Sequence, residues 1–335
     1  MESKQISMQG NKLTDSFGRI HDYLRLSITD RCNLRCTYCM PSNPVFLPHS
    51  NVLNLLEIDS LVDSFIALGV NKVRLTGGEP MVRPDFDAIA ATLAKKPVSL
   101  HLTTNGYFID EHIAAISECF DSVNVSLDTL KKERFKTITQ RNAFDRTLKN
   151  IDLLLSKNIP TKVNVVLVRN INDDEIYDFV ELTRRLPLEV RFIEFMPFNG
   201  NRWNLAQAVP QAEIIRRIEE KYAIEMFDRK VHQTAQKLRV KGSKGVFGLI
   251  STVSQPFCAD CNRIRITADG KIKNCLFSQH ETDIRHLIDD PARLAKAMAE
   301  EIQKKHYSYG GKAPMTNSDS QQQYTLNRTM TAIGG

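Results

Sequence analysis

Apolar runs alternate with amphipathic stretches along the first two thirds of the chain. Short runs rich in β-branched residues predict β-strands, and longer stretches with apolar residues at helical spacing predict helices. The predicted strands are Leu24–Thr29, Lys72–Thr76, Ser99–Thr104, Ser122–Leu127, Thr161–Val168 and Glu189–Phe195. The predicted helices are Leu55–Leu68, Phe86–Leu93, Glu111–Cys119, Phe144–Ser156 and Asp174–Leu186. Strands that alternate with helices form βαβ units, which build a parallel sheet.

This alternation defines six β/α units between Tyr23 and about Phe198. Eight such units close a full TIM barrel, so six predict an α/β fold in the form of an incomplete (β/α)6 barrel. Functional residues of such barrels gather at the C-terminal ends of the strands. We therefore expect the chemistry of this chain in the segments that follow the six strands.

The pattern changes after about Pro210. A helix at Ala212–Lys221 leads into hairpin-like segments at Val246–Val253 and Arg263–Thr267. An Asp-Gly turn follows at Ala268–Lys271, which indicates that the chain reverses there.

A helix at Pro291–Lys304 closes the ordered part of the chain. Residues 312–330 are rich in Ser, Thr, Asn and Gln, which predicts flexibility. The expected parts are an N-terminal segment (1–21), the partial barrel (22–210), a C-terminal α+β extension (211–311) and a flexible tail (312–335).

Composition and charge narrow the class of protein. The 335 residues are 42% apolar, enough for a large core, and the net charge is +6 with a pI near 8.9. This charge falls just short of the range of nucleic-acid-binding domains, so it fits an anionic small substrate or a solvated basic surface. No run of about eighteen apolar residues occurs, and Met1–Lys12 lacks an apolar signal region, so we expect a cytoplasmic protein without a membrane span.

Three of the seven cysteines, Cys32, Cys36 and Cys39, directly follow the first predicted strand in a C-x3-C-x2-C spacing. Three thiolates are one fewer than a structural zinc site or a four-cysteine iron–sulfur cluster uses. A cluster held by three cysteines keeps one iron open for another ligand, which is a catalytic arrangement. A labile structural metal site, or three cysteines that fill core, is the alternative.

A second trio, Cys258, Cys261 and Cys275, lies in the C-terminal extension and is expected to bind a second metal centre. A β-hairpin through the Asp-Gly turn would return Cys275 to the C-x2-C pair. Zinc with His280 as the fourth ligand is the structural alternative. The remaining cysteine, Cys119, lies on an apolar helical face and is expected to fill core.

The first trio, with the aromatic Tyr38 before its last cysteine, resembles the motif of the radical S-adenosylmethionine (SAM) enzymes. The two trios together resemble the GTP 3′,8-cyclase family of that superfamily, over almost the whole chain. This resemblance implies two [4Fe–4S] clusters, one in each trio, with one open iron each. It further implies that the first cluster reduces SAM and that the second binds the purine of GTP.

The implied reaction is the first step of molybdenum cofactor biosynthesis. A 5′-deoxyadenosyl radical takes a hydrogen atom from C3′ of GTP, and C3′ adds to C8 of guanine. The product is (8S)-3′,8-cyclo-7,8-dihydroguanosine 5′-triphosphate. The implied partners are a flavodoxin or ferredoxin as electron donor and cyclic pyranopterin monophosphate synthase as the next enzyme, and a homodimer is the expected assembly.

Motifs at the strand ends supply the residues that the resemblance assigns to ligands. Gly77–Pro80 follows the second strand, and the backbone around Gly78 is assigned to SAM, since glycine lets a ligand approach closely. On chemistry alone these glycines would form an ordinary turn, and Met196 would fill core. The further assignments are Tyr38, Ser126 and Met196 for SAM, and Thr103 and Lys162 for GTP.

Arg263 and Arg265 alternate on the predicted strand after the second C-x2-C, so their guanidinium groups share one face. Paired arginines suit phosphate recognition through bidentate, charge-assisted hydrogen bonds. We expect both to bind the triphosphate of GTP, and Arg25 and Arg74 on the first two strands to join them. A solvated strand face is the alternative.

The chain ends in Gly334 and Gly335, which would ordinarily form a disordered terminus. The resemblance implies that this pair enters the active site and is needed for the reaction, since residues without side chains can thread a narrow cavity.

Two other classes of protein stay open: a radical SAM enzyme with a peptide substrate, and a non-enzymatic zinc or nucleic-acid-binding protein. Iron and zinc analysis would separate them.

Overall fold

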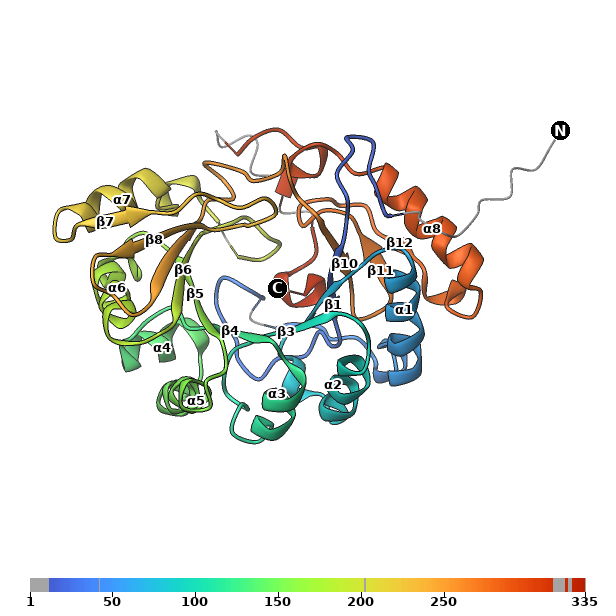
Figure 1. The fold of residues 1–335 in the computed structure, drawn as a ribbon, viewed down its shortest axis with the longest axis horizontal. Helices are drawn as coiled ribbons and strands as arrows, with labels where there is room; N and C mark the ends of the chain where they lie inside the picture. The colour runs from blue at the N-terminus through green and yellow to red at the C-terminus, as the bar shows by residue number, and fades with distance from the viewer. Residues whose placement is uncertain (1–11, 42, 202, 316–322, 325–326, 335) are drawn as a thin grey trace.

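The structure is a computed structural model that describes residues 12–41, 43–201, 203–315, 323–324 and 327–334. Within these residues, one sheet of twelve strands curves around an open centre, and the helices that connect its strands lie on the outer side (Figure 1). The strand order is β12-β11-β10-β1-β2-β3-β4-β5-β6-β9-β8-β7. The fold is α/β with a parallel central sheet, consistent with the expected incomplete barrel.

The six predicted parallel strands are present and pair side by side in chain order. They are β1 (Tyr23–Ser27), β2 (Lys72–Thr76), β3 (Ser99–Thr104), β4 (Ser122–Ser126), β5 (Thr161–Leu167) and β6 (Glu189–Glu194). The helices predicted between them are also confirmed, with ends that differ by at most two residues. They are α1 (Leu55–Ala67), α2 (Phe86–Ala94), α3 (Ile113–Cys119), α5 (Phe144–Ser156) and α6 (Ile176–Arg185).

Helix α1 illustrates how local sequence sets these elements. The Asn54 side chain accepts a hydrogen bond from the Glu57 N–H at 2.9 Å, and the Glu57 carboxylate accepts one from the Asn54 N–H at 2.7 Å. This capping box satisfies two amide groups at the start of the helix. Burial of one large apolar side chain stabilises the fold by roughly 1.5–3 kcal/mol. The face of α1 that enters the main core consists of Ile58, Leu61, Val62 and Phe65.

The C-terminal part of the chain extends both edges of this sheet. β9 (Val246–Ile250) pairs in parallel with β6, and β10 (Arg263–Ile266) pairs in parallel with β1. Both segments form hairpins, as expected: β9 pairs with the antiparallel β8 (Gln236–Val240), and β10 pairs with the antiparallel β11 (Lys271–Lys273). Each also adds to a different edge of the six-stranded sheet, which the sequence did not indicate. The C-terminal extension is therefore continuous with the barrel.

The remaining elements complete the two edges. The Asp-Gly turn is confirmed: Gly270 has a φ of +79°, and β10 reverses there into the antiparallel β11 (Lys271–Lys273). The helices predicted near the C-terminus are also present. Other elements are β7 (Ile224–Met226), β8 (Gln236–Val240), β12 (Thr282–Asp283), α4 (Lys132–Thr139), α7 (Gln211–Glu219) and α8 (Pro291–Gln303). None of the described helices is both long and apolar enough to cross a membrane.

The described part of the C-terminal tail is packed against the barrel. α10 (Met330–Ile333) lies inside the ring of strands, where Figure 1 marks the C-terminus. Arg328 forms an ion pair with Asp269 at 3.1 Å, which fastens the tail to the turn between β10 and β11. Residues 327–334 therefore make specific contacts with the barrel, and the flexibility expected for residues 312–335 stays a prediction.

Candidate active site

A cavity of about 460 Å³ occupies the centre of the barrel, and its wall contains all six cysteines of the two trios. A hollow of about 720 Å³ over α4 and α5 contains none of the predicted site residues, so the central cavity is the candidate site. The structure thus brings together residues from both ends of the chain. The predicted ligand residues in its wall are Tyr38, Gly78, Ser126, Met196, Arg25, Arg74, Thr103, Lys162, Arg263 and Arg265.

The first trio lies on the loop that follows β1. Backbone hydrogen bonds from Arg35 N to Thr139 O (2.9 Å) and from Thr37 N to Ile138 O (3.0 Å) fix this loop against the end of α4. Burial raises the pKa of the Cys32 thiol to about 11, so it stays protonated unless a cation such as iron stabilises its thiolate. Burial also raises the pKa values of the Cys36 and Cys39 thiols.

The second trio is assembled by the hairpin of β10 and β11. Cys258 and Cys261 precede β10, and Cys275 follows β11, so the Asp-Gly turn returns Cys275 to the C-x2-C pair as expected. Burial alone would raise the pKa of Cys261, but the charges of Arg263 and Lys305 lower it to about 6. This end of the cavity therefore favours a thiolate even without a metal.

The donors of both trios fit iron–sulfur clusters. All six are free thiols that line one cavity. His280, the alternative fourth zinc ligand, does not line this cavity, and its Nε2 lies 3.3 Å from Glu301 Oε2. Within the described residues, no three side chains of His, Cys, Asp or Glu lie close enough together to bind a single metal ion. This spacing argues against zinc, because a cluster of four irons holds its cysteine ligands further apart than one zinc ion does.

The Gly-Gly-Glu-Pro segment is shaped by close backbone packing. A Cβ on Gly78 would lie 2.5 Å from Arg31 O, so no larger residue fits beside the cysteine loop. The N–H of Gly78 donates to Thr29 O at 2.8 Å, which leaves its carbonyl as the group that could accept from an amino group of SAM. Glu79 accepts hydrogen bonds from Asn105 N at 2.6 Å and from Thr104 Oγ1, and burial raises its pKa to about 7.

Three further predicted SAM residues lie on the same side of the barrel. The Tyr38 hydroxyl donates to Asp128 just after β4, whose other carboxylate oxygen accepts from Val166 N at 2.8 Å. Ser126 ends β4, and the half-buried Met196 follows β6 within an apolar cluster that also contains Tyr38. The fixed phenol ring and the thioether give this wall an apolar surface that would suit a nucleoside.

The arginines form a row across three neighbouring strands. Arg25 on β1 lies in register with Arg265 on β10 and with Arg74 on β2. Two residues earlier on the same strand, Tyr23 is flanked in the same way by Arg263 and by a lysine of β2. Since alternate residues of a strand share a face, these cations all face the cavity, which is where the structure places them.

Crowding of these cations is electrostatically unfavourable without an anion. Burial and the neighbouring Arg74 and Arg263 lower the pKa of Arg25 to about 10, and burial with the charges of Arg25 and Arg263 lowers that of Arg265. Burial and Arg191 lower the pKa of Lys162 to about 8. A polyanion such as a triphosphate would relieve this repulsion.

Three buried polar atoms in the cavity wall have no hydrogen-bond partner among the described residues: Thr103 Oγ1, Asn124 Oδ1 and Asn164 Oδ1. A buried polar atom without a partner costs about 1–3 kcal/mol, so such atoms in a cavity mark contacts for a ligand. Thr103 is in register with Asn124 on the neighbouring strand, so these atoms form a polar strip beside the arginine row.

The described end of the tail reaches between the two trios. Met330 N donates to Cys39 O at 3.3 Å, and Arg265 donates to Gly334 O at 2.8 Å. Gly334 has a φ of +83°, and a Cβ there would lie 2.7 Å from Thr76 Oγ1, so only glycine fits. Gly335, the other residue of the predicted pair, lies outside the described residues.

Sequence reasoning missed several residues of the cavity wall, among them four on the strands of the sheet. Tyr23, Lys72 and Asn164 lie two positions from Arg25, Arg74 and Lys162 on the same strands, so the strand period could have indicated them. The Tyr23 hydroxyl accepts from Arg74 Nε at 2.6 Å. Burial alone would raise the pKa of Tyr23, but the charges of Arg74 and Arg25 lower it to about 7. The fourth is Arg191 on β6.

Strand-end cysteines, a glycine-lined loop and a central cavity in a partial barrel define the class of radical SAM proteins. The family model of the radical SAM superfamily matches residues 26–183, and that of Molybdenum Cofactor Synthesis C matches residues 188–310. A radical SAM protein carries a [4Fe–4S] cluster and SAM. The chain belongs to the GTP 3′,8-cyclase family within this class.

The relatives that show this family match nearly the whole chain. A protein of Arabidopsis thaliana named GTP 3′,8-cyclase, mitochondrial, is 42% identical over 96% of this chain and 83% of its own length. The GTP 3′,8-cyclase of Listeria monocytogenes is 39% identical over 96% of this chain and 99% of its own length. Molybdenum cofactor biosynthesis protein 1 of Drosophila melanogaster is 40% identical, but this chain spans only 57% of its length.

A distant solved structure shares the fold. Streptococcus suis SuiB bound to S-adenosylmethionine superposes with a TM-score of 0.65 at 14% identity, over 93% of this chain and 72% of SuiB. At this identity the likeness concerns the arrangement of strands and helices alone.

Proposed function

We propose that this protein converts GTP to (8S)-3′,8-cyclo-7,8-dihydroguanosine 5′-triphosphate, the lyase reaction that begins molybdenum cofactor biosynthesis. The observation that carries this proposal is that one cavity contains two separate cysteine trios with a row of buried arginines between them. A peptide substrate would not require such a concentration of buried cations. The names and lengths of the Arabidopsis and Listeria relatives support the same reaction.

The first trio would hold a [4Fe–4S] cluster, and the neighbouring Tyr38, Gly78, Ser126 and Met196 would hold SAM. When bound, this cluster and SAM supply the radical chemistry by which C3′ of GTP loses a hydrogen atom and bonds to C8 of guanine. The Gly78 carbonyl would accept from the SAM amino group, and Glu79 would stabilise the same positive charge. The cofactor would supply the bond cleavage, and these residues would orient it.

The second trio would hold a second [4Fe–4S] cluster and orient the guanine of GTP. Arg25, Arg74, Arg263 and Arg265 would bind the triphosphate through charge-assisted hydrogen bonds. Thr103 and Lys162 would contact the same nucleotide from β3 and β5. Correct placement of both reactants can contribute roughly 7–11 kcal/mol to the reduction of a barrier, so most of the protein's contribution would be geometric.

The C-terminal glycines would complete the cavity during the reaction. The Gly334 carbonyl accepts a hydrogen bond from Arg265, and this contact would tie the tail to the proposed nucleotide site. We further propose a flavodoxin or ferredoxin as electron donor, cyclic pyranopterin monophosphate synthase as the consumer of the product, a homodimeric assembly and a cytoplasmic location. Pull-down and size-exclusion experiments under anaerobic conditions would test these partners.

The experiment that tests the reaction is anaerobic incubation of the reconstituted chain with SAM, dithionite and GTP. We expect about eight irons and eight sulfides per chain, 5′-deoxyadenosine, and a product that is an isomer of GTP by mass spectrometry. Cys275→Ser should abolish the product, and the matched variant Cys119→Ser, outside the cavity, should not. Cleavage of SAM with GTP left unchanged in the parent chain would refute the proposed substrate.

A further inference from the structure

A buried lysine touches the second cysteine trio from outside the cavity. Lys305 follows α8, is only 4% exposed, and does not line the cavity. Its Nζ lies 3.5 Å from Cys261 Sγ. The adjacent Lys304 is different, because its side chain is 58% exposed and reaches only Glu301 at 3.7 Å. The chain therefore offers two neighbouring lysines, of which one is directed at a cysteine and the other at solvent.

The three protons of the Lys305 ammonium group match three acceptors. Besides Cys261 Sγ, Nζ lies 3.0 Å from Arg263 O and 3.4 Å from His21 Nδ1. A lysine ammonium has three donors and no acceptor, so this set satisfies the charged form fully. A buried charge without such partners would cost several kcal/mol. The three acceptors around Nζ therefore suit the charged ammonium form of Lys305.

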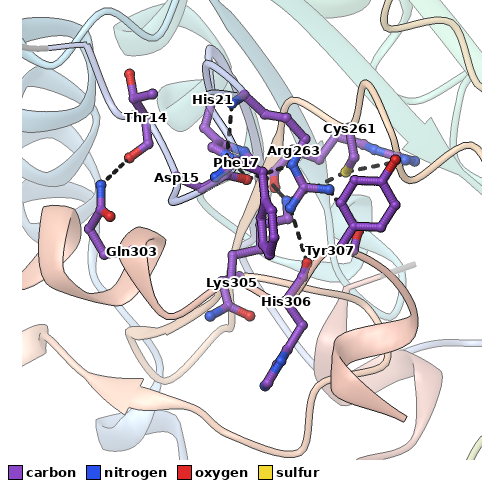
Figure 2. A network of polar contacts seen from close by, with 12 residues as sticks. Thr14, Asp15, Phe17, His21, Cys261, Arg263, Gln303, Lys305, His306 and Tyr307 are labelled. Atoms are coloured by element: carbon purple, nitrogen blue, oxygen red, sulfur yellow. Dashed lines mark hydrogen bonds and ion pairs between the residues drawn. The ribbon is translucent and has the colours of Figure 1, made fainter. Parts of the chain in front are cut away.

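A polar chain behind Lys305 fixes its orientation (Figure 2). Because His21 Nδ1 accepts from Lys305, the proton of the neutral ring is on Nε2, which donates to Asp15 Oδ2 at 3.0 Å. Asp15 also accepts from Arg19 Nε at 2.6 Å. Burial lowers the pKa of His21 to about 4, so the ring is neutral and serves as a relay of hydrogen bonds rather than as a second charge.

The same chain holds the loop of the second trio in place. Arg19 donates to Cys258 O at 2.7 Å, to Tyr307 O at 2.7 Å and to His306 O at 3.0 Å. The segment before β1 thereby connects the C-x2-C loop to the residues after α8. Among the described residues, the Lys305 ammonium group is the part of this network that contacts a cysteine sulfur from outside the cavity.

We propose that Lys305 is a positioning residue of the second cysteine trio: it fixes the Cys261 sulfur and places an ammonium group against the cluster that this trio would hold. This inference rests on the second cluster of the proposed function. Reduction potentials of iron–sulfur clusters depend on net charge and on hydrogen bonds to their sulfurs. A cation at Cys261 stabilises the reduced, more negative cluster, and a residue with a merely structural role would not change that equilibrium.

The test compares Lys305→Met, Lys305→Gln and Lys305→Arg with the matched control Lys304→Met. Each is made in the full chain, and also in a chain with Cys32, Cys36 and Cys39 replaced by Ala, so that only the second cluster is observed. The measurements are iron and sulfide content, the electron paramagnetic resonance signal of the reduced cluster and its midpoint potential by redox titration.

We expect Lys305→Met and Lys305→Gln to have a more negative midpoint potential, or to lose about half of the iron of the full chain. Lys305→Arg and Lys304→Met should match the parent in both potential and iron content. A parental potential and iron content in Lys305→Met and Lys305→Gln would overturn the inference. If both of these variants fail to fold although Lys305→Arg folds, Lys305 is a folding residue and the inference is equally overturned. A parent with about four irons would instead refute the second cluster itself.

Discussion

Replacement of Arg265 by alanine should weaken GTP binding far more than guanosine binding. Arg265 is 7% exposed and lies between Arg25 and the second trio, where a phosphate would meet it in a dry environment. One charge-assisted contact is worth about 1.5–3 kcal/mol, which corresponds to roughly a ten- to hundredfold rise in the Kd for GTP. Relief of repulsion within the arginine row offsets part of this loss, so we expect the lower half of that range.

The assay is anaerobic isothermal titration calorimetry of GTP and guanosine into parent and variant protein. Guanosine lacks the phosphates, so its Kd should change less than about twofold. Arg216→Ala, an exposed position on α7, is the matched control and should leave both affinities unchanged. Equal losses for GTP and guanosine would refute the reasoning, because they would show that Arg265 supports the cavity or the Gly334 carbonyl rather than the phosphates.

The other predictions concern separate parts of the site. Cys36→Ala should abolish 5′-deoxyadenosine formation with dithionite, since two thiolates cannot retain the first cluster; an undiminished yield would contradict the assignment. Gly334→Ala should bind GTP and SAM normally but lose most turnover, because its Cβ would meet Thr76 Oγ1 at 2.7 Å; normal turnover would mean that the tail has no part in the reaction. The KM for GTP should rise above about pH 8, because Lys162, whose pKa is lowered to about 8, binds phosphate only when protonated and loses its proton above that pH. Lys162→Arg should flatten this rise in a pH series of initial rates, and an unchanged profile would exclude Lys162 as the titrating group.

The central sheet could be predicted because its six strands are short apolar runs separated by amphipathic helices. Helix α4 was missed because Lys132–Thr139 is largely polar and buries only Phe135, Ile138 and Thr139. The C-terminal strands and the hairpin that returns Cys275 were recognised, but the pairing of β9 and β10 with the edges of the sheet was not. β10 has the half-polar sequence Arg263–Ile266, which resembles one arm of a hairpin, and nothing local shows that it pairs with β1.

The candidate site could be predicted as a set of residues but not as an arrangement. Arg25, Arg74 and Arg265 were expected to act together, but their alignment in one row depends on the register of three strands, which only tertiary structure fixes. Lys305 carries no signal at all in the sequence, because a lysine after a helix is ordinarily exposed. Its burial beside Cys261 depends on the distant His21.

The parallel pairing of β1 with β10 joins Tyr23 to Arg263, which are separated by 263 − 23 = 240 positions. A ribosome that adds roughly 5–20 residues per second needs about 12–48 s to supply the missing neighbour. During that interval β1 has an unpaired strand edge, and β6 has one from its synthesis until β9 is made. Such edges recruit other chains. The chain is therefore at risk of aggregation until the last third of it has been synthesised. The yield of folded protein should accordingly depend on chaperone capacity.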